Sequence, residues 1–147
     1  MTDAVQLALA AILSLSGGHG PVGIGTHELA VLVAQEAICH EVDPEVVVAV
    51  MSRESSFEVA AESGAGDHGL MQIRRGRATR GYRLRGERAI HAPATNVHLG
   101  VRRLAMARGD CPGSAPVAWL GGYAGVAGCV PTRYGRRVLR ERERIRS

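Results

Sequence analysis

Residues 43–56 place the strongest constraint on what this 147-residue chain can fold into. They open with Asp43, Pro44 and Glu45, a pattern typical of a helix N-terminus, because an acid can cap free N–H groups and proline suits the first helical turn. Residues 46–51 are then apolar and rich in β-branched side chains, which leaves a buried strand as the alternative. The start signal and the length of the segment favour a helix. Since this helix is apolar on most sides, we expect it to be the central helix of a helical core.

A carboxylate, Glu54, lies where the apolar run stops. Partial burial disfavours a charged carboxylate, so such a residue can keep its proton near neutral pH and act as a general acid. The alternative is an exposed Glu at a helix end, paired with Arg53 or another Arg. A glycine-rich turn follows, in which backbone can come close to a ligand. This turn presents Asp67, Gly69, Met71 and Gln72.

These two segments together carry a family resemblance. Glu54-Ser55-Ser56-Phe57, followed by S-G-A-G-D-H-G-L-M-Q-I at residues 63–73, resembles the signature of the soluble lytic transglycosylase (SLT) domain of the lysozyme-like superfamily. The resemblance extends over about residues 34–134. It implies a mainly α, lysozyme-like α+β fold, in which a helical bundle surrounds the central apolar helix and a short β-hairpin or irregular turn lines a cleft.

The resemblance also implies an activity, cleavage of the β-1,4 bond between N-acetylmuramic acid and N-acetylglucosamine in peptidoglycan, with no cofactor and no metal. Glu54 is then the general acid that later acts as base. The 6-hydroxyl of the muramic sugar attacks and leaves a 1,6-anhydro product. Tyr123 is similar to the tyrosine of the family's late Ala-Tyr-Asn-x-Gly motif, whose phenol points at the catalytic Glu, although Ala124 replaces the Asn here.

Five residues are expected to contact the sugar chain. They are Ser55, Gly69, Met71, Gln72 and Tyr134, with Met71 as the apolar floor of the sugar site. Each of the side chains has another interpretation. Ser55 could instead cap its helix, Gln72 could be a surface amide, and Met71 and Tyr134 could belong to the core.

Asp67 leaves the reaction type open. The stretch Asp67–Ile73 departs from the commoner Gly-Ala-x-Gly-Leu-Met-Gln and resembles the Asp-Tyr-Gly-x-x-Gln-Ile stretch of chicken-type lysozymes and of secretion-associated transglycosylases. In those lysozymes this Asp is the second catalytic carboxylate, so a hydrolase that uses Glu54 and Asp67 is the alternative activity. An Asp that bonds its own turn is the structural interpretation.

The charges suggest a polyanionic partner. All 18 basic residues are Arg, and residues 68–147 hold 17 of them with four acids, a net charge of +13, whereas residues 1–67 hold ten acids and one Arg. A basic half favours a cell-wall polymer, a nucleic acid or a membrane surface, and a solvated arginine face is the alternative. A non-catalytic protein that binds the cell wall or a nucleic acid is thus the alternative of another class. Aromatic residues make up 3% of the chain, which argues against base stacking.

The chain divides into residues 1–25, a helix and linker, and residues 26–147, the lysozyme-like domain. Residues 7–15 are apolar, so this first segment is also a candidate export segment, although no Lys or Arg precedes it. No apolar run is long enough to span a bilayer. The expected place is the periplasm or the outside of the cell, with secretion or envelope assembly as one setting.

The remaining signals concern cysteines, histidines and helix ends. Cys111 and Cys129 flank one predicted helix that Pro112 opens, and they could form a disulfide. The six His are scattered in the sequence, so no metal site is expected. Further helices are predicted from an N-cap at Thr26 to about His40, from Pro93 onward and over residues 131–145, with an arginine-rich irregular segment at 74–88 along one rim of the cleft.

Overall fold

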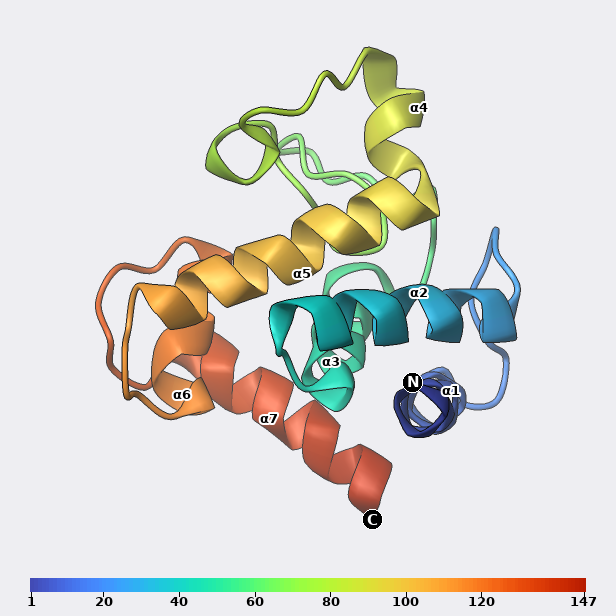
Figure 1. The fold of residues 1–147 in the computed structure, drawn as a ribbon, viewed down its shortest axis with the longest axis horizontal. Coiled ribbons are helices and arrows are strands. Elements are labelled where there is room, and N and C mark those ends of the chain that lie inside the picture. The colour runs from blue at the N-terminus through green and yellow to red at the C-terminus, as the bar shows by residue number, and fades with distance from the viewer.

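The apolar run at residues 46–51 forms the buried middle of helix α3 (Pro44–Ser55), which lies at the centre of the helical bundle (Figure 1). The computed structural model describes all 147 residues. The Asp43 side chain caps this helix by accepting a hydrogen bond of 2.8 Å from the Glu45 N–H. All six side chains of the run are at most 2% exposed. The structure therefore confirms the helix, its start signal and its central place, and excludes the strand.

Seven α-helices and two short 3-10 helices make up the fold, which confirms the expected mainly helical class. Besides α3, they are α1 (Thr2–Leu15), α2 (Thr26–His40), η1 (Arg77–Thr79), α4 (Gly86–His91), α5 (Pro93–Gly109), α6 (Pro116–Trp119), η2 (Leu120–Ala124) and α7 (Arg133–Arg146). Helix α3 packs against α1, α2 and α7, and α5 packs across α2 and η2. Pairing of β type is limited to isolated bridges, Val22 with Glu58 and His68 with Glu62 and Ile73, so the segment after α3 is an irregular turn rather than a hairpin.

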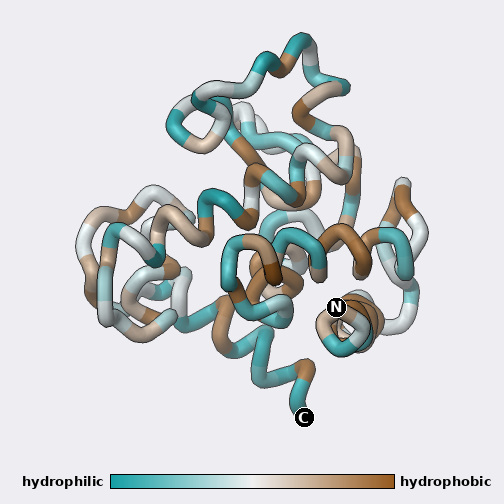
Figure 2. Tube along the Cα trace, viewed as in Figure 1, coloured by the Kyte–Doolittle hydropathy of each residue, from teal (hydrophilic) through white to brown (hydrophobic).

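Helix α1 is part of the same core as the rest of the bundle. Its residues Ala8, Ala11 and Ile12 are fully buried, while Asp3, Gln6 and Ser14 are exposed on the other face, so the helix is amphipathic. Figure 2 shows its apolar character beside the largely hydrophilic α7. None of the helices combines the length and the apolar character needed to cross a bilayer.

Two predicted helix starts are wrong. Gly25, and not Thr26, is the N-cap of α2, because the carbonyl of Gly25 already accepts the first helical hydrogen bond, from the Leu29 N–H at 2.9 Å. The helix expected from Pro112 begins only at Pro116. Residues 111–114 form a turn instead, with Gly113 in the left-handed region at φ +76°.

The cysteines behave as expected. Cys111 and Cys129 form a disulfide with their Cα atoms 5.5 Å apart. This bond ties the end of α5 to the segment that follows η2, and it encloses two short helices rather than one. Cys39 is exposed and free.

Gly100 lets α5 approach the turn that follows α3. A Cβ atom at this position would lie 2.5 Å from both Cβ and Cγ of Met71, whose side chain is fully buried. Contacts this short force neighbouring atoms to move. By contrast, a Cβ on Gly109, at the exposed end of the same helix, would meet nothing within 4 Å.

We expect Gly100→Ala to lower the free energy of unfolding by about 1–3 kcal/mol, because Met71 and its turn must shift to make room. The matched control, Gly109→Ala, should be neutral or stabilising by at most ~1 kcal/mol, since alanine favours the helix and no clash arises. Urea denaturation of both variants measures the difference. Equal stability of the two would contradict the close packing of Met71 against α5.

Candidate active site

Glu54 lies in the last turn of α3, where the chain reverses sharply. Ser56 and Phe57 both adopt left-handed backbone, with φ of 50° and 64°. Ser55 supports this reversal, because its hydroxyl donates to the Met51 carbonyl at 3.2 Å and accepts from the Phe57 N–H at 3.2 Å. The structure thus gives Ser55 the capping role that was its alternative. The reversal leaves the Glu54 side chain partly buried at the edge of the core.

A single strong hydrogen bond holds the Glu54 carboxyl. The hydroxyl of Tyr134, on α7, donates to Glu54 Oε1 at 2.7 Å. Burial raises the pKa of Glu54, whereas the hydrogen bond from Tyr134 and the nearby charge of Arg103 lower it. The net pKa lies above the ordinary value for Glu. Glu54 therefore keeps its proton to a higher pH than a surface carboxyl does.

The two tyrosines have different partners from those expected. The Tyr123 phenol does not point at Glu54, because it donates to the buried carbonyl of Met71 at 2.6 Å. The Tyr123 ring stacks on the Tyr134 ring at a centroid distance of 6.4 Å and an interplanar angle of 13°. Tyr134, predicted as a sugar contact with a core role as the alternative, is thus the tyrosine that bonds Glu54. A buried carbonyl needs a donor, and Tyr123 supplies it.

Asn96 fixes the turn opposite Glu54. It is fully buried on α5. Its Oδ1 accepts from the Met71 N–H at 2.7 Å, and its Nδ2 donates to the carbonyls of His68 and Ile90, both at 2.8 Å. Gly69 has φ +78°, and a Cβ there would collide with the Asn96 amide. The close approach that Gly69 permits is therefore to Asn96 and not to a sugar.

Met71 and Gln72 lie at different depths. Met71 is fully buried, so it cannot form the expected apolar floor of a sugar site, and the reason is its packing against Gly100. Gln72 lines the cavity beside Glu54. Its Nε2 donates to the carbonyls of Ala61 and Gly69, at 3.1 and 3.0 Å. These bonds hold the Gln72 amide at the cavity wall rather than free on the surface.

Asp67 is engaged in an ion pair. Arg74 donates from Nε to Oδ1 at 3.0 Å and from Nη2 to Oδ2 at 3.1 Å, and Ser63 Oγ donates to Oδ2 at 3.0 Å. Partial burial raises the pKa of Asp67, but the hydrogen bonds from Arg74 and Ser63 lower it more, so the net pKa lies below the ordinary value. Glu54 and Asp67 thus have opposite pKa shifts within one site.

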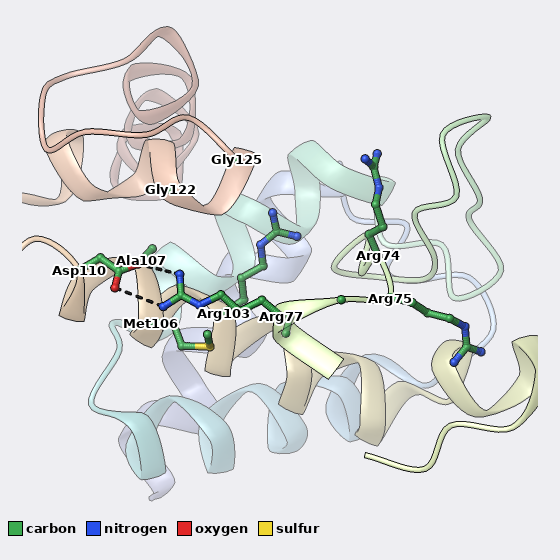
Figure 3. Close-up of a pocket in the computed structure, with 11 residues that line it drawn as sticks. Arg74, Arg75, Arg77, Arg103, Met106, Ala107, Asp110, Gly122 and Gly125 are labelled. Carbon is green, nitrogen blue, oxygen red and sulfur yellow. Dashed lines mark hydrogen bonds and ion pairs between the residues drawn. The ribbon is translucent and has the colours of Figure 1, made fainter. Parts of the chain in front are cut away.

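A cavity of about 290 Å³ brings four of the eight predicted site residues together, while Ser55, Gly69, Met71 and Tyr134 do not line it. Its walls include Glu54, Asp67, Gln72 and Tyr123, together with Arg74, Arg103, Ala124 and Gly125. A second cavity of about 320 Å³ shares three of these residues and adds further arginines (Figure 3). Arg74, Arg103 and Gly125 line both cavities, and Arg75 and Arg77 line only the second. The two cavities adjoin and form one groove. Glu54 and Asp67 line its first part, and arginines from the start of the 74–88 segment line its second part, where Arg77 forms an ion pair with Asp110 at 3.0 Å.

Arg103 is the residue of the groove that sequence reasoning missed. Figure 3 shows it projecting from α5 between Arg74 and the Gly122–Gly125 segment. Its guanidinium carbon lies 4.9 Å from the centre of the Tyr123 ring. It lies three residues after Gly100, on the side of α5 that faces the turn, but no motif in the sequence marks this position.

We expect Glu54→Gln to stabilise the protein near neutral pH, because it removes a carboxylate that burial disfavours. Since the folded pKa of Glu54 is raised, the folded state binds more protons than the unfolded state between the two pKa values, and stability falls as pH rises through that window. The advantage of E54Q in free energy of unfolding should therefore be small at pH 4 and larger at pH 7. Denaturation at several pH values measures it, with Glu87→Gln on the exposed face of α4 as control. An advantage that is absent at pH 7 would contradict the raised pKa.

The comparisons with known proteins agree with this geometry. The family model described as the transglycosylase SLT domain matches residues 32–143. The matched range covers well over half of the chain and contains Glu54, the turn at residues 63–73, Arg103 and Tyr134. No curated protein sequence matches the chain. This chain belongs to the transglycosylase SLT domain family, whose fold is lysozyme-like and mainly helical.

Proposed function

We propose that this protein is a lytic transglycosylase that cleaves the β-1,4 bond between N-acetylmuramic acid and N-acetylglucosamine, with Glu54 as general acid and then base. Membership of the SLT family implies a lysozyme-like enzyme that acts on peptidoglycan. The observation that carries the residue assignment is the position of Glu54, partly buried, at the wall of the groove and bonded by Tyr134. A proton donor beside the scissile bond is what glycosidic cleavage requires.

The reaction begins with proton transfer from Glu54 to the glycosidic oxygen as the bond to the anomeric carbon breaks. The leaving sugar departs with that proton, and positive charge develops at the anomeric carbon. The Glu54 carboxylate then accepts the proton of the 6-hydroxyl as this oxygen attacks the anomeric carbon. The product is a 1,6-anhydro sugar, and Glu54 has its proton again. The Tyr134 hydroxyl keeps the carboxyl in place and stabilises it while it is charged.

The bonding of Asp67 supports this reaction over hydrolysis. Both carboxylate oxygens accept charge-assisted hydrogen bonds from Arg74, and Oδ2 also accepts one from Ser63. An oxygen used in this way is a poor nucleophile. We propose that Asp67 shapes the cavity and contributes to the electrostatic field inside it. Hydrolysis with Asp67 as second carboxylate is the other candidate, because Asp67 lines the same cavity as Glu54.

The arginine-rich rim suits the proposed substrate. Peptidoglycan carries carboxylates on its peptide stems. Arg74 and Arg77 are paired with Asp67 and Asp110, but Arg75 and Arg103 add further positive charge to the groove, which attracts such a polyanion. The proposed place of action is the periplasm or the outside of the cell. Peptidoglycan lies there, and the Cys111–Cys129 disulfide suits an oxidising compartment.

We expect Glu54→Gln to slow the release of sugars from purified peptidoglycan by about 10²–10⁴-fold, the usual contribution of a general acid. Asp67→Asn should slow it by less than about tenfold, because Asp67 takes no part in bond making. Mass spectrometry of the wild-type products should show muramoyl ends lighter by one water than reducing ends.

Three results would argue otherwise. Equal rates for wild type and E54Q would remove Glu54 from the mechanism. Reducing ends, together with a D67N loss as large as that of E54Q, would establish the hydrolase. Binding of DNA without release of sugars would favour the non-catalytic alternative.

We further expect Arg103→Gln to raise KM for peptidoglycan by about two- to fivefold, because a partly exposed ion pair contributes about that much to binding. Added salt should shrink this difference, because it screens the wild-type attraction. Arg136→Gln removes the same charge from the exposed face of α7 and serves as the matched control. An equal change in KM for R103Q and R136Q would show that overall charge, and not the groove, binds the substrate.

A further inference from the structure

Three side chains outside the catalytic groove converge on one point. Glu62 and His68 come from the turn after α3, and His91 is the last residue of α4. His68 Nδ1 lies 3.0 Å from Glu62 Oε1, His91 Nε2 lies 3.2 Å from the same oxygen, and the two ring nitrogens are 3.3 Å apart. Three atoms that can each donate a lone pair thus form a nearly equilateral triangle.

Hydrogen bonding alone does not satisfy this triangle. An ionised Glu62 offers only lone pairs, so each nitrogen needs a proton to bond it. If both nitrogens carry protons, the two N–H groups of His68 and His91 oppose each other. If only one nitrogen carries a proton, the lone pair of the other nitrogen faces a lone pair of the Glu62 oxygen. A cation inside the triangle removes the conflict, because all three atoms then donate to it.

The ring nitrogen of His91 that points away from the triangle makes the hydrogen bond that is typical of a metal-ligating histidine. Its Nδ1 lies 3.0 Å from the carbonyl of Val59, which can only accept, so Nδ1 carries the proton. In the neutral ring this leaves the Nε2 lone pair directed into the triangle. Metal-ligating histidines characteristically donate their other N–H to a backbone carbonyl in this way.

We propose that Glu62, His68 and His91 bind one divalent transition-metal ion, with Zn²⁺ as the preferred ion. Two imidazoles and a carboxylate are a common zinc donor set. Ligands about 2.0–2.1 Å from a tetrahedral zinc ion lie roughly 3.3–3.4 Å from one another, close to the distances in this triangle. The two His side chains are 13% and 16% exposed and that of Glu62 is 45% exposed, so water can reach the fourth position.

A second cluster in the same protein shows what a satisfied arrangement looks like. His98 Nδ1 bonds Glu36 Oε2 at 2.8 Å, and the Tyr82 hydroxyl bonds the other ring nitrogen of His98 at 2.6 Å. His40 Nδ1 bonds the Glu36 carbonyl at 3.1 Å. One proton suffices for each of these contacts. The Glu36–His40–His98 cluster therefore needs no metal and supplies a matched control.

The metal would fasten the turn that carries the groove wall. His68 lies between Asp67 and Gly69, and its carbonyl is one of the acceptors of Asn96. The segment after α3 has isolated bridges, Glu62 with His68 and His68 with Ile73, in place of strands. A bond from this turn to the end of α4 would brace it next to the start of α5. The proposed role of the ion is to brace this turn, and it does not depend on the proposed peptidoglycan cleavage.

The test is zinc binding by the untagged, chelator-treated full chain, measured by isothermal titration calorimetry. We expect one equivalent of Zn²⁺ to bind wild type and His98→Gln, and the affinity to fall by more than about tenfold in His91→Gln and Glu62→Gln. Zn²⁺ should raise the Tm of wild type and His98→Gln, and should leave the Tm of His91→Gln and Glu62→Gln unchanged. Co²⁺ in place of Zn²⁺ should give the visible absorption of a tetrahedral site.

Glu62→Gln protects the test against misfolding, because it changes only the exposed ligand, and circular dichroism of each variant confirms the fold. Absence of Zn²⁺ binding to the wild-type chain would overturn the proposal. Equal affinity of the wild type and the Glu62 and His91 variants would overturn it as well. Neither outcome bears on Glu54, whose role rests on sugar release.

Discussion

The hydrogen bond from Tyr134 to Glu54 is the contact on which the proposed catalytic site depends. It joins the end of α3 to α7 across 80 residues of sequence, at the edge of the core. Burial and this bond act in opposite directions on the pKa of Glu54, and burial has the larger effect. A carboxyl in this position can hold a proton and still be stabilised after giving it up. That balance is what a residue that serves first as acid and then as base requires.

The wall opposite Glu54 is built without a sheet. Its backbone groups bond side chains from distant helices, with Asn96 satisfying the Met71 N–H and Tyr123 satisfying the Met71 carbonyl. These bonds bury Met71 and leave Gln72 at the cavity. The turn adds a few backbone hydrogen bonds of its own, such as the pair between His68 and Ile73, at 3.0 and 2.9 Å. The proposed metal site at His68 and His91 would add support where the chain has no strands.

Local signals predicted much of this structure. Asp43 and Pro44 mark a helix start by short-range physics, and an apolar run of that length must be buried, so the place of Glu54 at the rim of the core followed. The family resemblance added the groove. The features that the sequence did not predict depend on tertiary packing. The left-handed residues Ser56 and Phe57 and the close approach of Gly100 decide how the turn is oriented, and no local pattern shows that Met71 faces inward.

For the same reason, the sequence could not show which tyrosine bonds Glu54 or that His68 and His91 lie side by side. Tyr123 and Tyr134 are both near the groove, and only their partners in space distinguish them. His68 and His91 are 23 residues apart and touch through the fold of the turn, so their spacing in the sequence carried no signal. The proton on Nδ1 of His91 is likewise fixed by the carbonyl of Val59.

The most direct test of the central claim is an NMR titration of the Glu54 carboxyl carbon in the unliganded protein, with the resonance assigned by comparison with the Glu54→Gln variant. We predict a pKa for Glu54 above the ordinary value of about 4.3, and a further rise in Tyr134→Phe, which lacks the hydrogen bond that stabilises the carboxylate. A pKa at or below the ordinary value would mean that Glu54 is a solvated, ionised carboxylate near neutral pH, and it would contradict its role as proton donor.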